Sequence, residues 1–350
     1  MMRLAKLLQK GWSSRGVNVK PFSDLTSSEY SQASAICDLC VFTATKYTDY
    51  QVAYWAGKNQ LLEDCRIVAF ENNEVSGFFD VFIVDEGERL AIIGSSLRVR
   101  PPALSEALND KRREFLTRSF VSVLLECFAV YSNDNCSPVD LRFSVEFEST
   151  GSEHFLDQIL SSNLPYRVDV LQDLFLSLEP SLDQIYAGFR KSYRPLIRKW
   201  ENSFTCDTSW DVSSDVWEEF LALHFICAGR KTRSDNSWAL QKKALDEKKA
   251  LLTCVRSVDD LSLVGGAYCF ISPMIGLYGV GAYDKAKTDR PVGHLAQWSI
   301  IKKLKELGID KYYLGALKRE NEKLQAIGLF KAGFGASRVP NLIFTFSAVV

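Results

Sequence analysis

One stretch of the chain, residues 276–335, most constrains what it can fold into. The stretch is expected to form strand, loop, helix, strand and helix, through GLYGVGAYD at 276–284, KTDRPVGHLAQW at 287–298, YYLGAL at 312–317 and GLFKAGFG at 328–335. A strand that enters a Pro-Gly loop at the start of a helix can present unpaired backbone amides, and such amides bind phosphate groups. The stretch therefore indicates a site for a phosphate-bearing acyl carrier.

A similar order of elements is expected twice along the chain. The first set comprises strands 65–70, 75–84 and 89–94, helix 111–131, strand 139–147, helix 153–161 and strand 166–178. The second set comprises strands 251–256, 261–271 and 276–283, helix 293–307, strand 311–314, helix 319–329 and strand 341–347. The sets are offset by roughly 180 residues, which is far longer than the period of a solenoid repeat. A duplicated domain explains the repeat, with ordinary alternation of helices and strands as the alternative.

The length of the chain supports two domains. At 350 residues it exceeds the usual size of a single hydrophobic core. We predict an α/β (α+β) fold with domains at 1–175 and 176–350, each a mostly antiparallel mixed sheet flanked by helices. A helical segment at 181–247 is expected between the two sets of elements, with Pro195 kinking or splitting its first helix.

Charge and hydropathy exclude several classes of protein. The chain has 42 basic and 43 acidic residues, so no net field would attract nucleic acid or an anionic membrane. The sequence contains no run of about 18 apolar residues, so it predicts no membrane-spanning helix. The N-terminus lacks the apolar core of a secretory signal. We expect a cytoplasmic protein with small-molecule substrates and no membrane partner. The sequence leaves open whether two copies of the chain form a homodimer.

Cysteine and histidine usage also favours a cytoplasmic protein and gives no sign of a metal site. The nine cysteines are scattered and odd in number, which favours free thiols in a reducing compartment. Cys37 and Cys40 form a lone C-x-x-C without a second pair, and the three histidines have no metal-ligand spacing. The sequence predicts no metal site.

Residues 175–347 resemble the FemAB-type branch of the GNAT acyltransferase superfamily. The resemblance is carried by SLDQIYAGFRKSYRPLIRKW at 181–200, the strand–loop–helix at 276–298 and FKAGFG at 330–335, whereas the first half matches in element order only. It implies two tandem GNAT-like domains, with the donor site in the second. It also implies an N-acyltransferase.

The resemblance leaves two donors open. One group of the family transfers amino acids from aminoacyl-tRNA to peptidoglycan precursors. The other uses coenzyme A thioesters, including for the amine of nucleotide-linked amino sugars of surface polysaccharides such as lipopolysaccharide O-antigen. The near-neutral charge and the lack of a coiled-coil arm favour coenzyme A as donor and a dTDP-linked amino-dideoxy sugar as acceptor. The tRNA-dependent reaction is the alternative, with nucleic acid as a partner only in that case. A catalytically silent binding module is a third reading.

A loop in the second half departs from the family pattern. GNAT enzymes hold the coenzyme A pyrophosphate on a Q/R-x-x-G-x-G/A loop, and this chain has RPVGHLA at 290–296. The arginine and the first glycine are kept, but leucine stands at the last place. The resemblance implies cofactor binding by Arg290, Val292, Gly293, Leu295 and Ala296. Leu295 could instead only anchor the helix in the core.

Three residues are candidates for the chemistry. Lys331 matches a lysine that, in the peptidoglycan-branching relatives, stabilises charge at the reacting carbonyl. Asp284, at the end of a strand, is the first candidate for a base, and His294 is the second because its pKa suits proton transfer. Tyr283 could protonate the departing thiolate. A solvated lysine, a capping or core histidine and a packed tyrosine are the alternatives.

Two further groups are candidates for binding the acceptor. Arg194 and Arg198 lie one helical turn apart and could clamp a diphosphate, helped by Lys191 and Tyr193. A solvated helix face is the alternative. Tyr50 and Tyr54 lie in an aromatic segment, KYTDYQVAYWAGKN at 46–59, that could stack on a base or sugar or line a core helix.

Overall fold

The computed structural model describes residues 3–146, 152–287, 289–318 and 320–348. Two compact units make up the chain: Met1–Leu171 with Pro340–Val350, and Gln172–Val339. The sequence analysis instead kept 176–350 in one domain. The difference arises because strand β15 (Ser337–Ala348) pairs along β8 (Val139–Glu146) of the first unit. Phe147 and residue 319, which the sequence placed at element ends, lie outside the described residues.

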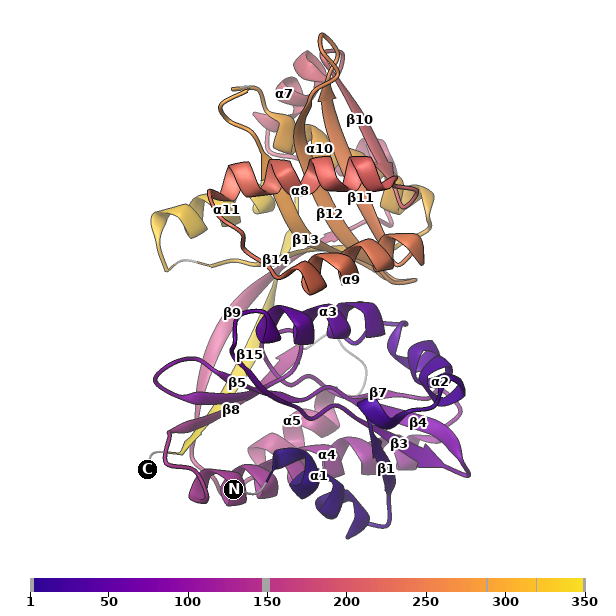
Figure 1. Ribbon diagram of the computed structural model, residues 1–350, viewed down its shortest axis with the longest axis vertical. Coiled ribbons are helices and arrows are strands. Elements are labelled where there is room, and N and C mark those ends of the chain that lie inside the picture. Colours follow the sequence, from indigo (N-terminus) through magenta and orange to yellow (C-terminus); the bar gives the residue numbers. More distant parts are fainter. Residues whose placement is uncertain (1–2, 147–151, 288, 319, 349–350) are drawn as a thin grey trace. The chain divides into compact units, whose positions relative to one another are not determined.

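The first unit contains two sheets and flanking helices (Figure 1). Its helices are α1 (Leu4–Ser13), α2 (Ser27–Cys37), α3 (Thr45–Ala56), α4 (Asp110–Asn133) and α5 (Ser152–Leu160), with a 3-10 turn at Phe22–Asp24. Its other strands are β1 (Asn18–Pro21), β2 (Leu61–Asp64), β3 (Ile67–Glu71), β4 (Glu74–Phe79), β5 (Phe82–Asp85), β6 (Leu90–Ile93), β7 (Ala103–Leu104) and the start of β9 (Tyr166–Ser177). The strand orders are β1-β3-β4-β7 and β15-β8-β6-β5-β2.

Strand alternation in the first unit builds cores on both faces of its sheets. Ile67 and Ala69 join the core of α1, α4 and α5, whereas Val68 between them packs with α2. Ile83 joins the first core and its neighbour Phe82 packs with α3. Successive side chains of a strand point to opposite faces, so each strand contributes apolar surface to two cores.

The single strand predicted at 75–84 is wrong. The chain forms β4 and β5 there, in different sheets, with Asp80 and Val81 between them. The Asp80 carboxylate accepts hydrogen bonds from the Ser95 amide at 2.6 Å and the Ser95 hydroxyl at 3.0 Å. Burial raises the pKa of Asp80 to about 6. The apolar residues continue across the break, which hid it from the sequence analysis.

Helix α4 is a core helix of the first unit. By length and composition it is the one described helix that could span a membrane, but 67% of its most apolar window is buried. Leu116, Phe120 and Leu124 are fully buried in the first core. Burial of this extent is typical of the core helix of a globular unit.

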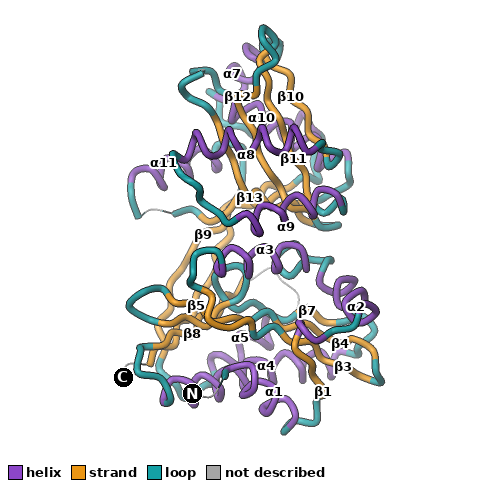
Figure 2. The backbone as a smooth tube through the Cα atoms, viewed as in Figure 1, coloured by secondary structure: helices purple, strands orange, loops and turns teal. Residues whose placement is uncertain are grey.

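The second unit is one sheet with helices on both faces (Figure 2). Its helices are α6 (Leu182–Ala187), α7 (Tyr193–Trp200), α8 (Ser214–Ala228), α9 (Asp235–Asp246), α10 (Val292–Glu306) and α11 (Glu322–Ala332). Its strands are β10 (Phe204–Ser209), β11 (Ala250–Ser257), β12 (Leu263–Ile271), β13 (Ile275–Tyr283), β14 (Lys311–Ala316) and the end of β9, in the order β10-β11-β12-β13-β14-β9. Gly265 lies against Val292 of α10 and the next residue, Gly266, against Phe220 of α8. Helices α8 and α10 therefore cover opposite faces.

Segment 181–247 differs from its prediction in two ways. It contains strand β10, which the sequence analysis missed because FTCDTS has too little apolar alternation, and which pairs with β11 at the sheet edge. The helix at 181–200 breaks between Ala187 and Tyr193 rather than at Pro195. Pro195 lies in the first turn of α7, where its missing amide hydrogen costs no helical hydrogen bond.

The predicted duplication is confirmed by the topology. Each unit contains one parallel pair of strands joined by a helix: β6–α4–β8 in the first and β13–α10–β14 in the second. Every other strand pairing described within the units is antiparallel. The chain is thus two tandem GNAT-like α/β domains.

The pairing of β15 with β8 generates a prediction. Phe346 is fully buried in the first unit and meets Phe143 edge-on, with ring centroids 5.9 Å apart. We expect Phe346→Ala to lower the unfolding free energy of the first unit by about 3–5 kcal/mol, because it leaves a cavity. Chemical denaturation and hydrogen exchange of β8 peptides measure this. Val168→Ala, at an exposed position of β9, should change stability by less than about 0.5 kcal/mol. Unchanged β8 protection in Phe346→Ala would contradict the assignment.

Candidate active site

The second unit has an opening between two neighbouring strands. β13 and β14 pair in parallel only at Ile275↔Lys311, Gly276↔Tyr312 and Leu277↔Tyr313. β13 then continues to Tyr283 without a further described pairing on that side. On its other side, Cys269 pairs with Tyr278 and Tyr268 with Val280, so Gly279 is an extra, bulged residue. A bulge bends the strand, and here it accompanies the divergence of β13 from β14.

Two tyrosine hydroxyls meet over β13. The hydroxyls of Tyr278 and Tyr283 lie 3.2 Å apart. A Cβ at Gly281 would come within 2.0 Å of the Tyr278 hydroxyl, so only glycine leaves room for it. Burial raises the pKa of both tyrosines, and the neighbouring ring raises that of Tyr278 further. Both are therefore protonated hydrogen-bond donors at neutral pH.

Gln297 of α10 is a buried amide in the same region. Its Oε1 accepts a hydrogen bond from the Tyr312 hydroxyl at 2.9 Å, while Nε2 has no partner among the described residues. The Gln297 side chain opposes the rise in the pKa of both Tyr278 and Tyr283, which places its amide near their hydroxyls. A buried donor without a partner is costly, and such a group is available to a ligand.

Lys331 lies in the last turn of α11 and reaches over β14. Its Nζ is 5.3 Å from the centre of the Tyr278 ring. Gly315 has φ +100°, and a Cβ there would lie 2.9 Å from Nζ. Burial lowers the pKa of Lys331 to about 8, and the positive charge of Lys318 lowers it further in the same direction. Lys331 is thus a largely desolvated ammonium near the point where the strands part. The sequence analysis had ended this helix at residue 329, before Lys331.

The start of α10 offers fewer amides than the sequence predicted. The amide of Val292 donates to the Arg290 carbonyl at 2.9 Å, and those of His294 and Leu295 donate to the Pro291 carbonyl at 2.8 and 3.3 Å. Among the described residues, only the Gly293 amide of the first turn lacks an acceptor. The expectation of several unpaired amides at this helix start is therefore wrong.

The remaining predicted cofactor residues are packed. Val292, Leu295 and Ala296 are buried, with Leu295 and Ala296 in the core of the second unit. A Cβ at Gly293 would contact the rings of Tyr283 and Phe330 at 3.3 and 3.4 Å. The leucine in the family's glycine or alanine place is a core residue in this structure.

Asp284 caps the turn after β13. Its carboxylate accepts hydrogen bonds from the amides of Ala286 at 2.9 Å and Lys287 at 3.1 Å. The side chain is buried. These contacts explain an aspartate at this position by turn geometry, so the structure gives it a structural task.

His294 packs in an aromatic cluster. Its ring meets Tyr193 edge-on at 4.3 Å and Phe330 at 5.1 Å between centroids. Burial lowers its pKa to about 4, despite an opposing hydrogen bond with Pro291. The imidazole is therefore neutral at physiological pH.

The FKAGFG motif anchors α7 beside this cluster. The Tyr193 hydroxyl donates to the Phe330 carbonyl at 3.1 Å, and a Cβ at Gly333 would lie 2.4 Å from the Tyr193 ring. Tyr193 is buried, so it is a packing residue rather than an open contact for the acceptor.

The predicted basic clamp lies on α7 and just before it. Lys191 and Arg198 are exposed and Arg194 is half-buried. Arg198 lies 6.0 Å from the Tyr186 ring, and the Tyr186 hydroxyl donates to the Arg194 carbonyl at 2.7 Å. The described ion pairs include none of these three basic residues.

Arg290 lies in the loop before α10, and the two predicted tyrosines belong to the first unit. The Arg290 guanidinium stacks on Trp200 at 3.8 Å. Tyr50 and Tyr54 belong to α3 of the first unit, with rings 6.1 Å apart, and Lys58 lies 4.2 Å from the Tyr54 ring. Tyr50 is buried as in a core helix.

The described residues of the first unit form no such opening. After β6 diverges from β8, the chain returns and Val99 bridges Phe143 in parallel, with the Val99 amide donating to Arg142 at 2.7 Å. Helix α4 begins at the capped Asn109, followed by Asp110, whose charge opposes an anion there. The opening between parallel strands belongs to the second unit.

The sequence analysis missed Tyr278, Gln297 and Gly315. A signal existed for Tyr278, because GLYGVGAYD alternates glycine with large residues on one strand. Nothing in the local pattern marked Gln297 or Gly315, since their importance comes from Tyr312 and Lys331 on other elements. Among the described residues, no group of three His, Cys, Asp or Glu side chains could hold a metal ion.

Comparison with known proteins places the fold. No protein-family model and no curated protein matches the chain. Solved structures do: FemX aligns with a TM-score of 0.60 and 12% identity, covering 94% of this chain and 97% of its own. L-PGS from Bacillus licheniformis aligns with a TM-score of 0.53 and 12% identity, and the alignment covers 97% of this chain and 90% of the L-PGS chain. A conserved protein of unknown function from Bacteroides thetaiotaomicron VPI-5482 aligns with a TM-score of 0.58 and 11% identity, covering 94% and 99%.

These likenesses extend over both units. The fold is like that of FemX and L-PGS, and at such low identity the likeness concerns the fold alone. The residues in the opening therefore have to be argued from their own chemistry.

The buried ammonium of Lys331 generates a prediction about stability. The unfolded chain has the ordinary lysine pKa of 10.5 and the folded chain about 8. Between these values the unfolded state binds more protons, so the penalty for burying Lys331 is complete below pH 8 and fades as pH rises toward 10.5. We expect Lys331→Met to raise the unfolding free energy by at most roughly 3 kcal/mol at pH 7 and by much less at pH 10.

Chemical denaturation at the two pH values measures the effect. Lys323→Met, at an exposed position of the same helix, is the matched control and should show no pH-dependent gain. Equal behaviour of the two variants would contradict the burial of Lys331.

Proposed function

We propose that the second unit transfers an acyl group from coenzyme A to the amine of a nucleotide-linked, dTDP-type amino-dideoxy sugar. The observation that carries this is the desolvated Lys331 ammonium over Gly315, where β13 and β14 part. A positive charge in a low-dielectric opening favours a reaction that develops negative charge there. Acyl transfer is such a reaction.

The proposed chemistry needs no covalent intermediate with the protein. The neutral amine attacks the thioester carbonyl carbon, a C–N bond forms, and the carbonyl oxygen takes up the negative charge. Collapse breaks the C–S bond and expels the thiolate. The nitrogen loses its extra proton to solvent and the thiolate gains one. Lys331 acts on the carbonyl oxygen through its charge.

The tyrosine pair suits the departing sulfur. Tyr278 and Tyr283 are protonated, and their hydroxyls lie 3.2 Å apart near the free Nε2 of Gln297. We assign them the hydrogen bond to the leaving thiolate. Gln297 is oriented by the Tyr312 hydroxyl, which donates to its Oε1.

The proton acceptor is assigned to solvent. The carboxylate of Asp284 is held by two backbone amides, and the ring of His294 is enclosed by Tyr193 and Phe330. Neither arrangement orients a base toward the opening. In this proposal the amine arrives neutral, and the rate follows its own ionisation.

The basic face of α7 suits the acceptor. Arg194 and Arg198 lie one turn apart on α7, a short amphipathic helix, and Lys191 lies two residues before its first residue. Guanidinium groups bind the diphosphate of a sugar nucleotide in a forked geometry. A soluble donor and acceptor fit a cytoplasmic enzyme, which we include in the proposal.

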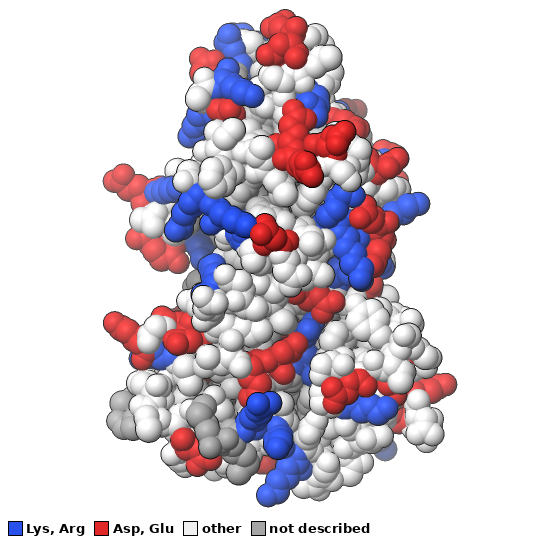
Figure 3. Space-filling model, viewed as in Figure 1, with Lys and Arg blue, Asp and Glu red and all other residues white. Residues whose placement is uncertain are grey.

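A second candidate is transfer of an aminoacyl group from tRNA to a cell-wall precursor. Only the Gly293 amide remains open in the first turn of α10, which reduces the grip on a pyrophosphate. The likeness to FemX and L-PGS fits aminoacyl transfer as well. Against it, basic and acidic side chains of the described residues are interspersed on the face in Figure 3, rather than gathered in one basic field.

Kinetics of variants test the proposed chemistry. Lys331→Ala should lower kcat by roughly 10²–10³ with little change in KM, because its charge acts in the transition state. Arg194→Ala should raise the KM for the acceptor, since a diphosphate is held alike in ground and transition states. Asp284→Asn should keep near-normal kcat, because asparagine can accept the same amide hydrogen bonds.

Lys323→Ala on the exposed face of α11 is the control for Lys331→Ala. If Lys331→Ala retains normal kcat, the proposed electrostatic role is wrong. A large loss of kcat in Asp284→Asn or His294→Ala would instead indicate that this side chain acts as the base.

Direct binding tests the donor. We expect calorimetry to show binding of coenzyme A and none of charged tRNA. Binding of tRNA alone would support the second candidate. If neither binds, the unit is a silent binding module and the proposal fails.

A further inference from the structure

A second pocket lies beside the loop that precedes α10. It has a volume of about 390 Å³ and is lined by residues at the end of α7, in the turn between β11 and β12, and by Lys287 and Arg290 before α10. This volume falls in the range of about 300–1,000 Å³ that holds small ligands. Apart from Arg290, none of its lining residues has a role in the transfer described above.

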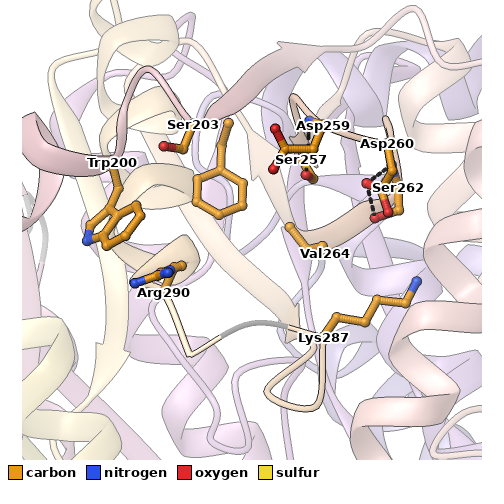
Figure 4. Close-up of a pocket in the computed structure, with 10 residues that line it drawn as sticks. Trp200, Ser203, Ser257, Asp259, Asp260, Ser262, Val264, Lys287 and Arg290 are labelled. Carbon is orange, nitrogen blue, oxygen red and sulfur yellow. Dashed lines mark hydrogen bonds between the residues drawn. The ribbon is translucent and has the colours of Figure 1, made fainter.

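The pocket has two sides of opposite character (Figure 4). Arg290 and Lys287 lie along one side, and Asp259 and the hydroxyl-bearing Ser257 and Ser262 lie along the other. Val264 lies between the two sides, and Phe204 also lines the pocket. A simple anion would meet the carboxylates, and a simple cation would meet the two basic groups. The ligand that fits is therefore itself two-sided.

The cationic side is organised by stacking. The Arg290 guanidinium lies 3.8 Å from the centre of the Trp200 ring, and this contact fixes the plane of its donors. Lys287 and Arg290 are three residues apart in the chain and precede the first turn of α10. The positive end of the helix dipole adds to their charge. This side suits phosphate groups.

The opposite side suits hydroxyls and an amine. Carboxylate and hydroxyl oxygens accept hydrogen bonds from ribose hydroxyls and from the exocyclic amine of adenine. The flat, apolar surface of a base can rest on Phe204 and Val264. Thymine and uracil lack the exocyclic amine, so they satisfy Asp259 less well than adenine does.

We propose that this pocket binds the adenosine 3′,5′-bisphosphate end of coenzyme A. This inference rests on the proposed acyl-CoA function and specifies where the donor's nucleotide is held. The two phosphate positions of the nucleotide face the two basic groups, and its adenosine faces Asp259. Arg290 is thus a nucleotide-binding residue on the ring of Trp200, rather than part of an amide cradle.

Calorimetry with adenosine 3′,5′-bisphosphate and the full chain tests the pocket without any turnover. Arg290→Ala and Lys287→Ala should each weaken binding about 10-fold, the usual loss for one charge-assisted contact. Arg167→Ala, an exposed arginine of the first unit, is the matched control and should not change binding. Trp200→Phe should retain most of the affinity and Trp200→Ala should lose it, with circular dichroism confirming that both fold.

5′-AMP, which lacks the 3′-phosphate, should bind about 10-fold more weakly than the bisphosphate. Equal binding of the two nucleotides overturns the assignment to coenzyme A and points to a 3′-terminal adenosine such as that of tRNA. If the bisphosphate does not bind, or if its affinity is unchanged in both Arg290→Ala and Lys287→Ala, the assignment of the pocket is wrong.

The outcome for the pocket is separable from the outcome for the proposed function. If acyl transfer from coenzyme A proceeds but the bisphosphate neither binds nor competes, the pocket assignment is wrong and the function stands. If the bisphosphate binds through Arg290 and Lys287 but no acyl group is transferred, the pocket stands and the function is wrong.

Discussion

The short parallel ladder between β13 and β14 is the constraint on which the rest of the second unit depends. Its three residue pairs hold the strands together at one end, and the bulge at Gly279 accompanies their separation at the other. A strand that loses its neighbour exposes backbone groups and side chains that a continuous sheet would cover. Tyr278 and Tyr283 fill part of this opening from β13, and Lys331 reaches it from α11. A shift of one residue in the register of β13 would turn Tyr278 and Tyr283 to the other face of the sheet.

Two unfavourable features coincide at this opening. Lys331 is a half-buried ammonium whose pKa is lowered by burial, and Gly315 is a glycine within a strand that contributes no packing. An apolar residue in place of Lys331 would improve stability, whereas a side chain at Gly315 would be strained at its φ of +100° and would lie against Nζ. Natural sequences keep such combinations mainly where activity requires them. The coincidence strengthens the case for a functional Lys331 more than the lowered pKa alone would.

Elements with strong periodicity could be predicted from the sequence, and features that depend on distant contacts could not. The helices α4 and α10 and the strand β8 were predicted within a few residues because apolar residues recur at the right period. Strand β10 was missed because its side chains are only partly buried at a sheet edge. Lys331 was singled out by resemblance, but its position over Gly315 arises from the packing of α11 on β14, which no local pattern encodes. The first turn of α10 shows a different error. The loop motif predicted unpaired backbone amides, but most of them donate hydrogen bonds to the carbonyls of Arg290 and Pro291.

The duplicated topology separates what the fold requires from what the site requires. Both units join parallel strands through a helix, so this arrangement by itself serves folding. In the first unit Val99 pairs again with β8. The start of α4 is capped by Asn109, and the negative charge of Asp110 disfavours an anion there. In the second unit the strands stay apart, the helix start has no side-chain cap, and basic residues precede it. Since both units satisfy the same packing rules, stability alone does not account for the uncapped helix, the bulge and the buried lysine. The binding and chemistry proposed for the second unit would account for all three.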